Sequence, residues 1–429
     1  MLGEHFENFC REILIDNLDE IQTSVGEIAK KLNLEYYETQ GDKESNIYIV
    51  GSIGRGTAIK NCSDVDLIFD LPQSVYDRFD AYENNGQSAL LQEIKSVLKE
   101  RYPRTDMRGD GQVVVIEFDK YTIELVPGFK QSDDSFTYPD THDGGSWKRT
   151  DPLSEQAECK NAAADSNGIY SDFCHLIRAW KNECGFKFGG LLIDTLVYNH
   201  FKEKDYYKDS TADDYFDILI NLLEYLKSQD KNQSYWLAVG SNQYVYNSDN
   251  GKFVNKAKKA HKKLTEAKDD EILDALAELF GKDFKPKKET KNLYESCNYR
   301  HTEEFIENIF YVDIKYNLSI DCEVSQSGFR NFFLRRALSE NHILRHNKSL
   351  RFFIDNIDVP KPYDIYWKVR NVGAVAEEKD QIRGQINKTN LDYQREKTSF
   401  RGSHFVECYI IKNQVCVARA RIDVPIGNF

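Results

Sequence analysis

The sequence has no long apolar segment. Nowhere in its 429 residues does it approach the ~18 consecutive apolar residues that a membrane-spanning helix requires. The opening residues, MLGEHFENFC, also lack the pattern of a secretory signal peptide. With 30% charged residues and a mean hydropathy of −0.62, the composition predicts a soluble, cytoplasmic protein without a membrane partner.

Positive charge is scarce as well. The 57 lysines and arginines are outnumbered by 70 aspartates and glutamates, which gives a formal net charge of −13. A protein that grips a nucleic-acid backbone over a long face usually has a basic excess, so we expect no extended nucleic-acid surface here. If the protein acts on nucleotides, it must hold them with a local basic pocket or with metal ions.

Cysteine is present but never as a C-x-x-C pair. The nine cysteines are spread along the chain, and most lie inside apolar runs. This placement predicts reduced, buried thiols and argues against a zinc cluster.

At ~150 residues per domain, the length of the chain predicts two or three structural units. Three sequence patterns follow one another along the chain. Residues 3–36 have apolar positions at helical spacing and predict one long amphipathic helix, and the short apolar runs after it predict a small α/β sheet. Helical periodicity comes next, and the last third is β-branched and aromatic. We therefore expect an α+β protein with a sheet-containing lobe over 1–152, a helical lobe over 153–281, a linker over 282–291 and a β-rich domain over 292–429.

The most informative stretch is GSIGRGTAI at 51–59, directly after an apolar run ending at Val50. Gly51 lets the backbone approach a ligand closely, and Ser52 offers a hydroxyl and backbone N–H groups suited to phosphate oxygens. We take Arg55 of the same loop as a further phosphate-binding candidate. Alone, such a glycine-rich sequence is a common turn, and only the residues after it give it a more specific meaning.

Asp64 and Asp66 come next, on a predicted strand. Because they are two residues apart, both side chains point to one face, where two carboxylates repel each other unless a cation lies between them. Mg²⁺ takes one or two carboxylates plus substrate phosphates and fits that demand. Two such ions ~3.5–4 Å apart would activate an attacking hydroxyl and stabilise the leaving pyrophosphate, and Mn²⁺ is an alternative metal.

A third carboxylate is needed from a neighbouring strand. Glu124 in the run TIELVP is well placed, and we take it as the third catalytic and metal-binding residue. Glu117 and Asp119 lie close by and could hold the position instead. Any of the three could also make a cross-strand ion pair.

At these residues the sequence resembles the polymerase-β-type nucleotidyltransferases, and within them the bacterial CD-NTases (cGAS/DncV-like nucleotidyltransferases, also called SMODS). The resemblance covers about residues 1–280. It implies a polymerase-β-like palm, a helical lobe of the 2′-5′-oligoadenylate-synthase type, and the joining of nucleoside triphosphates into cyclic di- or trinucleotides for anti-phage defence. Asp64, Asp66 and Ser52 match the family pattern, whereas many relatives have Asp where this chain has Glu124.

The helical lobe offers further candidates through the same resemblance. The segment LIRAWK at 176–181 is similar to the family helix whose lysine neutralises the donor triphosphate, so Lys181 is the candidate here. The alternative is an ordinary solvated helix face, and the same two interpretations apply to the lysine-rich stretch over 252–268. Relatives often begin the next helix with Ser-Tyr, but this chain has Gly189-Gly190. Base stacking must then come from another aromatic side chain, and the candidates are Tyr235, Trp236 and Tyr244.

The last domain has no obvious catalytic constellation. The run PYDIYWKVRNVG at 362–373 and neighbouring segments resemble the AGS-C domain, a sensor domain fused behind such nucleotidyltransferases. The resemblance implies an activating ligand. Trp367 predicts a buried anchor in a β-sandwich, with Lys368 and Arg370 on the opposite face, either as an anion contact or to keep that face soluble.

Together these features predict a metal-dependent enzyme that joins ATP and other NTPs into a cyclic oligonucleotide, which a downstream effector would sense. A second hypothesis keeps the metal site but yields a linear product or a modified RNA or protein. A third is a catalytically silent nucleotide sensor.

Overall fold

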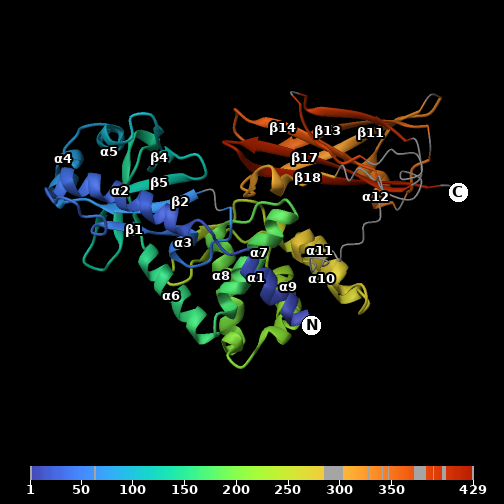
Figure 1. The fold of residues 1–429 in the computed structure, drawn as a ribbon, viewed down its shortest axis with the longest axis horizontal. Coiled ribbons are helices and arrows are strands. Elements are labelled where there is room, and N and C mark those ends of the chain that lie inside the picture. The colour runs from blue at the N-terminus through green and yellow to red at the C-terminus, as the bar shows by residue number, and fades with distance from the viewer. Residues whose placement is uncertain are drawn as a thin grey trace, which may run out of the picture. The chain divides into compact units, whose positions relative to one another are not determined.

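The computed structural model describes residues 2–61, 64–284, 303–326, 328–340, 342–345, 347–371, 383–389, 391–398 and 402–427. The chain forms two compact units (Figure 1). Unit 1 contains Met1–Ala179 and Gly189–Ala275, and unit 2 contains Trp180–Phe188 and Leu276–Phe429. The sheet-containing lobe and most of the helical lobe therefore share one unit. No helix of the described residues is long and apolar enough to cross a membrane.

A mixed sheet forms the first part of unit 1. Its central strands β2 and β5 run parallel, while their other neighbours pair antiparallel. The sheet order is β1-β2-β5-β4-β3, and β6 and β7 extend from β5. The strands are β1 (Ile47–Ile49), β2 (Asp64–Asp70), β3 (Asp106–Asp110), β4 (Val113–Glu117), β5 (Thr122–Lys130), β6 (Phe136–Asp140) and β7 (Ser146–Thr150).

Helices pack against one face of this sheet. Apolar residues of α2 (Leu18–Tyr37), α4 (Gln73–Asp80) and α5 (Gly86–Arg101) share a core with alternate residues of β2, β4 and β5. Because side chains alternate along a strand, the residues between these core positions point to the opposite face. The acidic residues of β2 therefore point away from the helices.

The predicted single helix over 3–36 is wrong. The chain forms α1 (Leu2–Glu12) and α2, and between them Leu14 bridges to Ile59 while the Lys60 amide donates to the Ile13 carbonyl at 2.7 Å. These backbone pairings hold the intervening residues out of a helix. The apolar periodicity continues through both helices because α1 packs on the helical part of unit 1, with the ring of Phe6 5.9 Å from that of Tyr215.

The second part of unit 1 is helical, as the periodicity predicts. Both α7 and α11 begin in unit 1 and end in unit 2. On α10 the lysines at 258, 259 and 262 are exposed, whereas Phe253 and Leu264 are buried. The helices are α6 (Pro152–Asp165), α7 (Ile169–Glu183), α8 (Gly190–Glu203), α9 (Tyr215–Ser228), α10 (Lys252–Glu266) and α11 (Ile272–Phe280), and a two-stranded sheet joins β8 (Tyr235–Leu237) to β9 (Tyr244–Tyr246). Of the expected linker, Lys282–Phe284 is a 3-10 helix and 285–291 lies outside the described residues.

Unit 2 is a β-sandwich, as the sequence predicts. One sheet has the order β10-β18-β17-β14-β15 and the other β12-β11-β13-β16, and apolar residues of both form a common core that includes Trp367. The strands are β10 (Tyr311–Val312), β11 (Leu318–Ser325), β12 (Phe332–Phe333), β13 (Ser349–Ile357), β14 (Asp364–Arg370), β15 (Ile386–Thr389), β16 (Tyr393–Lys397), β17 (Gly402–Lys412) and β18 (Val415–Ile426), and α12 spans Leu334–Ser339.

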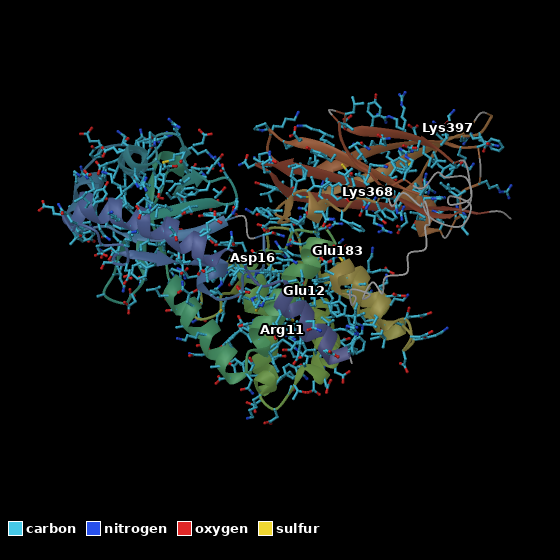
Figure 2. The ribbon with its side chains drawn as sticks, in the orientation of Figure 1. Arg11, Glu12, Asp16, Glu183, Lys368 and Lys397 are labelled. Atoms are coloured by element: carbon cyan, nitrogen blue, oxygen red, sulfur yellow. The ribbon has the colours of Figure 1, made fainter. Side chains whose placement is uncertain are left out.

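The outer face of the larger sheet carries buried ion pairs. Lys368 is 3% exposed and contacts Glu303 at 3.2 Å and Glu407 at 3.3 Å, so it neither keeps this face soluble nor stands ready for an outside anion. Arg419 contacts Glu407 and also Glu183 of α7, at 3.5 and 3.4 Å. Figure 2 labels Glu183 and Lys368 in this unit. The end of α7 is thus tied to the sandwich by charge.

The seven cysteines that the structure describes are free thiols, and six of them are buried. Burial raises the pKa of Cys159 and of Cys416 to about 12. These thiols are therefore protonated at neutral pH and poorly reactive.

Candidate active site

Two neighbouring parallel strands bring three carboxylates to one face of the sheet. In the register of β2 with β5, Asp66 lies directly opposite Glu124 and Asp64 opposite Thr122. All three acidic residues are partly exposed. The apolar residues between them point into the core under the helices. The local alternation that predicted a shared face for Asp64 and Asp66 therefore extends to Glu124 through strand pairing.

Both burial and neighbouring negative charge act on the Glu124 carboxyl group. Its pKa is raised, first by burial and then by the charges of Asp66 and Asp110, with Arg108 acting in the opposite direction. An ionised carboxylate in such surroundings is destabilised unless a cation approaches it.

Neither of the two alternative acidic residues lies opposite Asp66. Glu117 pairs across the sheet with Thr122 and forms an ion pair with Arg108 on β3. Asp119 is exposed in the turn between β4 and β5. Of the three candidates, the structure therefore places Glu124 beside Asp66.

The glycine-rich loop lies directly against this face. Gly51 begins α3 (Gly51–Gly54) with a φ of +63°, and a Cβ atom on it would lie 1.8 Å from the Asp66 carboxylate oxygen. The Val50 amide donates to the Asp66 carbonyl at 2.8 Å. Only glycine satisfies both the backbone conformation and the close approach. The loop that carries Ser52 is therefore packed on β2, the strand of Asp64 and Asp66.

The fit of this site to Mg²⁺ rests on its donor atoms. In the part of the chain that the structure describes, no three acidic, histidine or cysteine side chains are already gathered closely enough to enclose a metal ion. The available donors are nevertheless carboxylate oxygens, which Mg²⁺ prefers, and a cation would stabilise the ionised form of Glu124, whose pKa is raised first by burial and then by the charge of Asp66. Asp64, Asp66 and Glu124 are therefore suitable ligands.

Arg55 is not brought to the carboxylates of β2 and β5. Its side chain is buried, and its Nε donates to Asp194 on α8 at 2.8 Å while NH1 donates to Glu155 on α6 at 3.2 Å. The contacts fix the end of the glycine-rich loop to the helical part of unit 1.

Asp194 is the centre of this network, and the sequence-based prediction did not include it. It is fully buried and also accepts hydrogen bonds from the Thr57 hydroxyl at 3.0 Å and from Arg178 at 2.6 and 2.9 Å. These cations hold the pKa of Asp194 well below its usual range. The available signal was a charged residue inside the apolar run GLLIDTLV, because a buried acid is rare unless it is paired.

Lys181 also has partners of its own. It is 8% exposed, and its Nζ donates to the Ile314 carbonyl at 2.9 Å and lies 3.4 Å from a carboxylate oxygen of Asp313, both within unit 2. Lys181 is thus engaged by an ion pair and a hydrogen bond within unit 2.

The three aromatic candidates for base stacking differ in solvent exposure. Trp236 is 5% exposed and packs against Phe253, so it belongs to the core. Tyr235 and Tyr244 are 40% and 57% exposed, with ring centroids 4.2 Å apart on the β8–β9 hairpin. Two of the three candidates thus stay open to solvent.

Comparison with known proteins identifies related domains at both ends of the chain. Residues 1–162 match the model of the Second Messenger Oligonucleotide or Dinucleotide Synthetase (SMODS) domain. Residues 300–427 match that of the Adenylyl/Guanylyl and SMODS C-terminal sensor (AGS-C) domain. No curated protein matches the chain.

Solved structures of low sequence identity share the fold. CdnC of Escherichia coli MS115-1, in complex with HORMA-ΔN, is 13% identical with a TM-score of 0.52, and the match covers 66% of this chain and 98% of that one. CdnC of the same strain with ATP is 15% identical with a TM-score of 0.51, over the same shares of the two chains. At this identity the likeness concerns the fold alone.

Proposed function

We propose that this chain is a nucleotidyltransferase of the CD-NTase type, which joins NTPs into a cyclic oligonucleotide second messenger and releases pyrophosphate; its matches to the SMODS domain over residues 1–162 and to the AGS-C domain over 300–427 support this proposal. The observation that carries the proposal is the pairing of Asp66 with Glu124 across parallel strands, with Asp64 on the same face and the Gly51 loop packed on Asp66.

Each part of the site has a role in this reaction. Asp64, Asp66 and Glu124 would hold two Mg²⁺ ions, which supply charge neutralisation for the phosphates and lower the pKa of the acceptor hydroxyl. Ser52 and the N–H groups of its loop would orient the donor β- and γ-phosphates. The loop is kept in shape by the amides of Thr57 and Ala58, which donate to the Ser52 carbonyl at 2.9 and 3.1 Å.

The chemical step is a displacement at the donor α-phosphorus. The 2′- or 3′-hydroxyl oxygen of the acceptor nucleotide forms the new bond to phosphorus, the bond to pyrophosphate breaks, and the hydroxyl proton passes to solvent. A further step of the same kind closes the ring. Arg55 and Lys181 have no part in this proposal, because Arg55 pairs with Asp194 and Glu155, and Lys181 pairs with Asp313.

The biological setting proposed here rests on the family. The product would act as an alarm signal in anti-phage defence, a separate effector would sense it, and the AGS-C domain would regulate synthesis in response to a ligand.

The full-length protein incubated with all four NTPs and Mg²⁺ or Mn²⁺ tests the proposal. We expect pyrophosphate release and a phosphatase-resistant product whose mass equals that of a cyclic oligonucleotide, and both should disappear with EDTA. Product that phosphatase degrades would indicate a linear oligonucleotide, and label retained on RNA or protein would indicate another acceptor.

Substitutions of the carboxylates sharpen the test. Asp66→Asn and Glu124→Gln should each lower pyrophosphate release at least 100-fold. Each replaces a carboxylate that would bind the metal ions by a neutral carboxamide. Glu117→Gln is the matched control, since that carboxylate lies on the adjacent strand but pairs with Arg108. Unchanged turnover in Asp66→Asn would overturn the proposal, and loss in Glu117→Gln alone would reassign the third ligand.

A further inference from the structure

The smaller sheet of the β-sandwich, which contains β11 and β13 (Figure 1), carries arginines and aromatic rings on its outer face. Phe352 of β13 is buried in the core, so its neighbours Arg351 and Phe353 point outward. Tyr393 and Arg395 of β16 lie directly opposite Phe353 and Arg351. Because directly paired residues share a face, two rings and two guanidinium groups lie together on the outside of this sheet.

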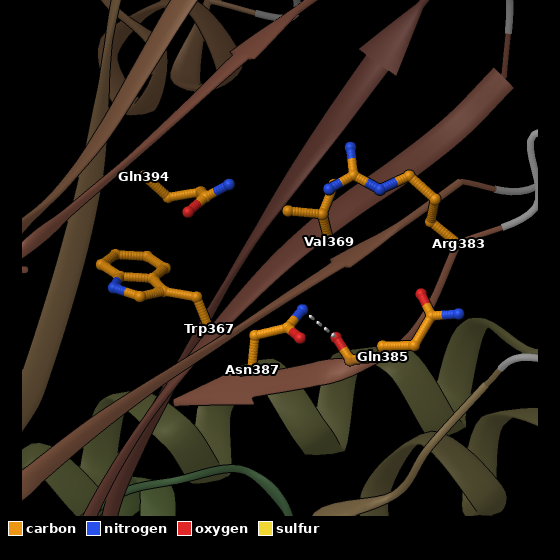
Figure 3. Close-up of a pocket in the computed structure, with 6 residues that line it drawn as sticks. All are labelled: Trp367, Val369, Arg383, Gln385, Asn387 and Gln394. Atoms are coloured by element: carbon orange, nitrogen blue, oxygen red, sulfur yellow. Dashed lines mark hydrogen bonds between the residues drawn. The ribbon is translucent and has the colours of Figure 1, made fainter. Parts of the chain in front are cut away.

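Gln394, between the two outward-facing residues of β16, faces the other way. It pairs with the core residue Phe352, and Figure 3 shows it with Trp367 among the side chains at the edge of the sandwich. Side chains of a strand alternate between its two faces, so the inward position of Gln394 supports the outward orientation of Tyr393 and Arg395.

The guanidinium groups lie close to the rings. The Cζ atom of Arg351 is 5.8 Å from the ring centroid of Phe353 and 5.2 Å from that of Tyr393, and the Cζ atom of Arg395 is 5.3 Å from the Tyr393 centroid. Phe333 of β12 is 52% exposed, and its ring lies 6.0 Å from that of Phe353. These contacts join the five side chains into one surface, which we call the aromatic–arginine patch.

The two arginines of the patch face each other without a carboxylate between them. Arg351 and Arg395 are directly opposite in the register, an arrangement of like charges that destabilises a sheet. Both are exposed, and among the described residues neither guanidinium forms an ion pair or a hydrogen bond. Glu323, opposite Arg351 on β11, accepts a hydrogen bond from Asn331 at 2.9 Å instead. A bound anion would therefore relieve a repulsion that the fold leaves uncompensated.

Arginines without carboxylate partners beside exposed rings match the chemistry of a single-stranded nucleic acid. Its phosphates would pair with the guanidinium groups, and its unstacked bases would lie on the rings, a contact that every base can make. A double helix keeps its bases stacked and would offer the patch phosphates alone. An acidic peptide would likewise engage the arginines and leave the rings unused.

We propose that the aromatic–arginine patch binds a single-stranded nucleic acid, RNA or DNA, over a few nucleotides. A patch of this size is compatible with the net charge of −13, which argues only against a long basic face. This inference goes beyond the catalytic proposal and does not depend on it, because all five residues of the patch belong to unit 2.

Fluorescence anisotropy of the full chain with labelled oligo(U) and oligo(dT) of ~12 nucleotides tests the proposal. EDTA in the buffer prevents metal-dependent binding at the acidic strands of unit 1. We expect saturable binding of at least one strand, and the difference between the two identifies RNA or DNA as the preferred ligand. The affinity should decrease as salt is raised, because phosphate contacts release counterions.

Two competitors distinguish this ligand from other polyanions. A blunt duplex of the same length and a poly-glutamate of equal charge should each displace the labelled strand at least tenfold less well than the unlabelled strand does. The proposal is overturned if neither single strand saturates, or if either competitor is as effective as the unlabelled strand, because the rings would then contribute nothing.

Substitutions separate the patch from general charge effects. The double variant Arg351→Gln, Arg395→Gln should weaken binding at least tenfold, and Tyr393→Leu at least fivefold because a stacking surface is lost. The matched control, Lys388→Gln with Arg421→Gln, removes the same charge from the outer face of the larger sheet, where the two cations pair with aspartates at 2.7 and 3.1 Å. The control should change the affinity less than twofold, and an equal loss in both double variants would overturn the proposal.

Ultraviolet crosslinking locates the contact in the unsubstituted protein, so the test does not depend on the folding of any variant. Strands containing 4-thiouridine or 4-thiothymidine are irradiated with the full chain, and the crosslinked peptides are identified by mass spectrometry. We expect crosslinks on β13 or β16, and crosslinks confined to other segments would overturn the assignment to this patch.

Discussion

Gly51 is the residue at which backbone conformation and the acidic site meet. Its positive φ and its contact with Asp66 are both required for the glycine-rich loop to approach the β2 carboxylate. Gly56, five residues later, has a φ of +70° but no atom within 4 Å of where a Cβ would stand. A side chain at Gly56 would therefore strain only the left-handed backbone, whereas one at Gly51 would also clash with Asp66.

We predict that Gly51→Ala lowers pyrophosphate release at least 100-fold, because the added methyl group must displace the Asp66 carboxylate. Gly56→Ala should keep most of the activity. Both variants introduce an alanine into the left-handed region at about 1–2 kcal/mol, so thermal melting should show a comparable loss of stability from that source. Equal activity in the two variants would contradict the role given to the Gly51 contact.

His175 on α7 contacts the same loop at Gly56. It is 5% exposed, its Nε2 contacts the Gly56 carbonyl at 3.2 Å, and its Nδ1 has no hydrogen-bond partner among the described residues. Burial and the charge of Arg178 lower the pKa of His175 to about 4. The folded protein therefore holds this ring neutral where the unfolded chain, with a pKa near ~6.5, already takes up a proton.

The free energy of unfolding should consequently decrease as the pH is lowered from about 6.5 toward 4. Between pH 7 and pH 5 the contribution of His175 is about 2 kcal/mol, lost on acidification. Urea denaturation at the two pH values should show a smaller loss for His175→Gln than for the unsubstituted protein. His200, whose pKa is also lowered to about 4, is present in both proteins and cancels in the comparison. Parallel losses would mean that His175 does not set this dependence.

At the scale of elements, Asp194 joins three segments of unit 1. The carboxylate on α8 receives Arg178 from α7 and both Arg55 and Thr57 from the loop after α3. Buried charges are stabilised only while their partners are present, since an unpaired ion in the interior loses its hydration without compensation. The glycine-rich loop is therefore positioned by a helix that lies far from it in the sequence.

We predict that Asp194→Asn destabilises unit 1 by about 3–5 kcal/mol, because two buried guanidinium groups lose their shared counter-ion. The measurement is urea denaturation followed by circular dichroism. Asp217→Asn makes the same chemical change at an exposed position of α9 and should shift the free energy of unfolding by less than about 0.5 kcal/mol. A similar effect of both substitutions would show that the network contributes little.

At the scale of the whole molecule, the division into units does not follow the order of the chain. The segment Trp180–Phe188 continues α7 but belongs to unit 2, where Asn182 exchanges hydrogen bonds with the backbone of Val312 and Ile314. Arg419 of β18, buried among Glu183, Glu307 and Glu407, adds charge pairing. One continuous helix is thus anchored in both units.

We predict that Arg419→Met loosens unit 2, because three carboxylates lose a common buried cation. Hydrogen–deuterium exchange should quicken over 180–188 and over β17 and β18, while the sheet of unit 1 keeps its protection. Arg345→Met, at an exposed position of the same unit, is the control and should leave exchange unchanged. Faster exchange throughout unit 1 would indicate that the two units open together.

The sequence by itself determined what depends on neighbours along the chain. The strand periodicity of β2 put Asp64 and Asp66 on one face, the glycine-rich loop preceded them, and β-branched runs predicted the sandwich with Trp367 in its core. These features arise from the two-residue repeat of a strand and from local backbone preferences. The predicted long first helix failed where a tertiary contact, the bridge of Leu14 to Ile59, overrode the periodicity.

Only the tertiary structure decided which charges meet. Glu124 became the neighbour of Asp66 through strand pairing, whereas Arg55 found a partner 139 residues away and Lys181 one 132 residues away. A sequence does not show whether the charge of a lysine or arginine faces a phosphate or a buried carboxylate. The choice depends on the burial and the partner that folding supplies, because the free energy of a charge is set by its surroundings.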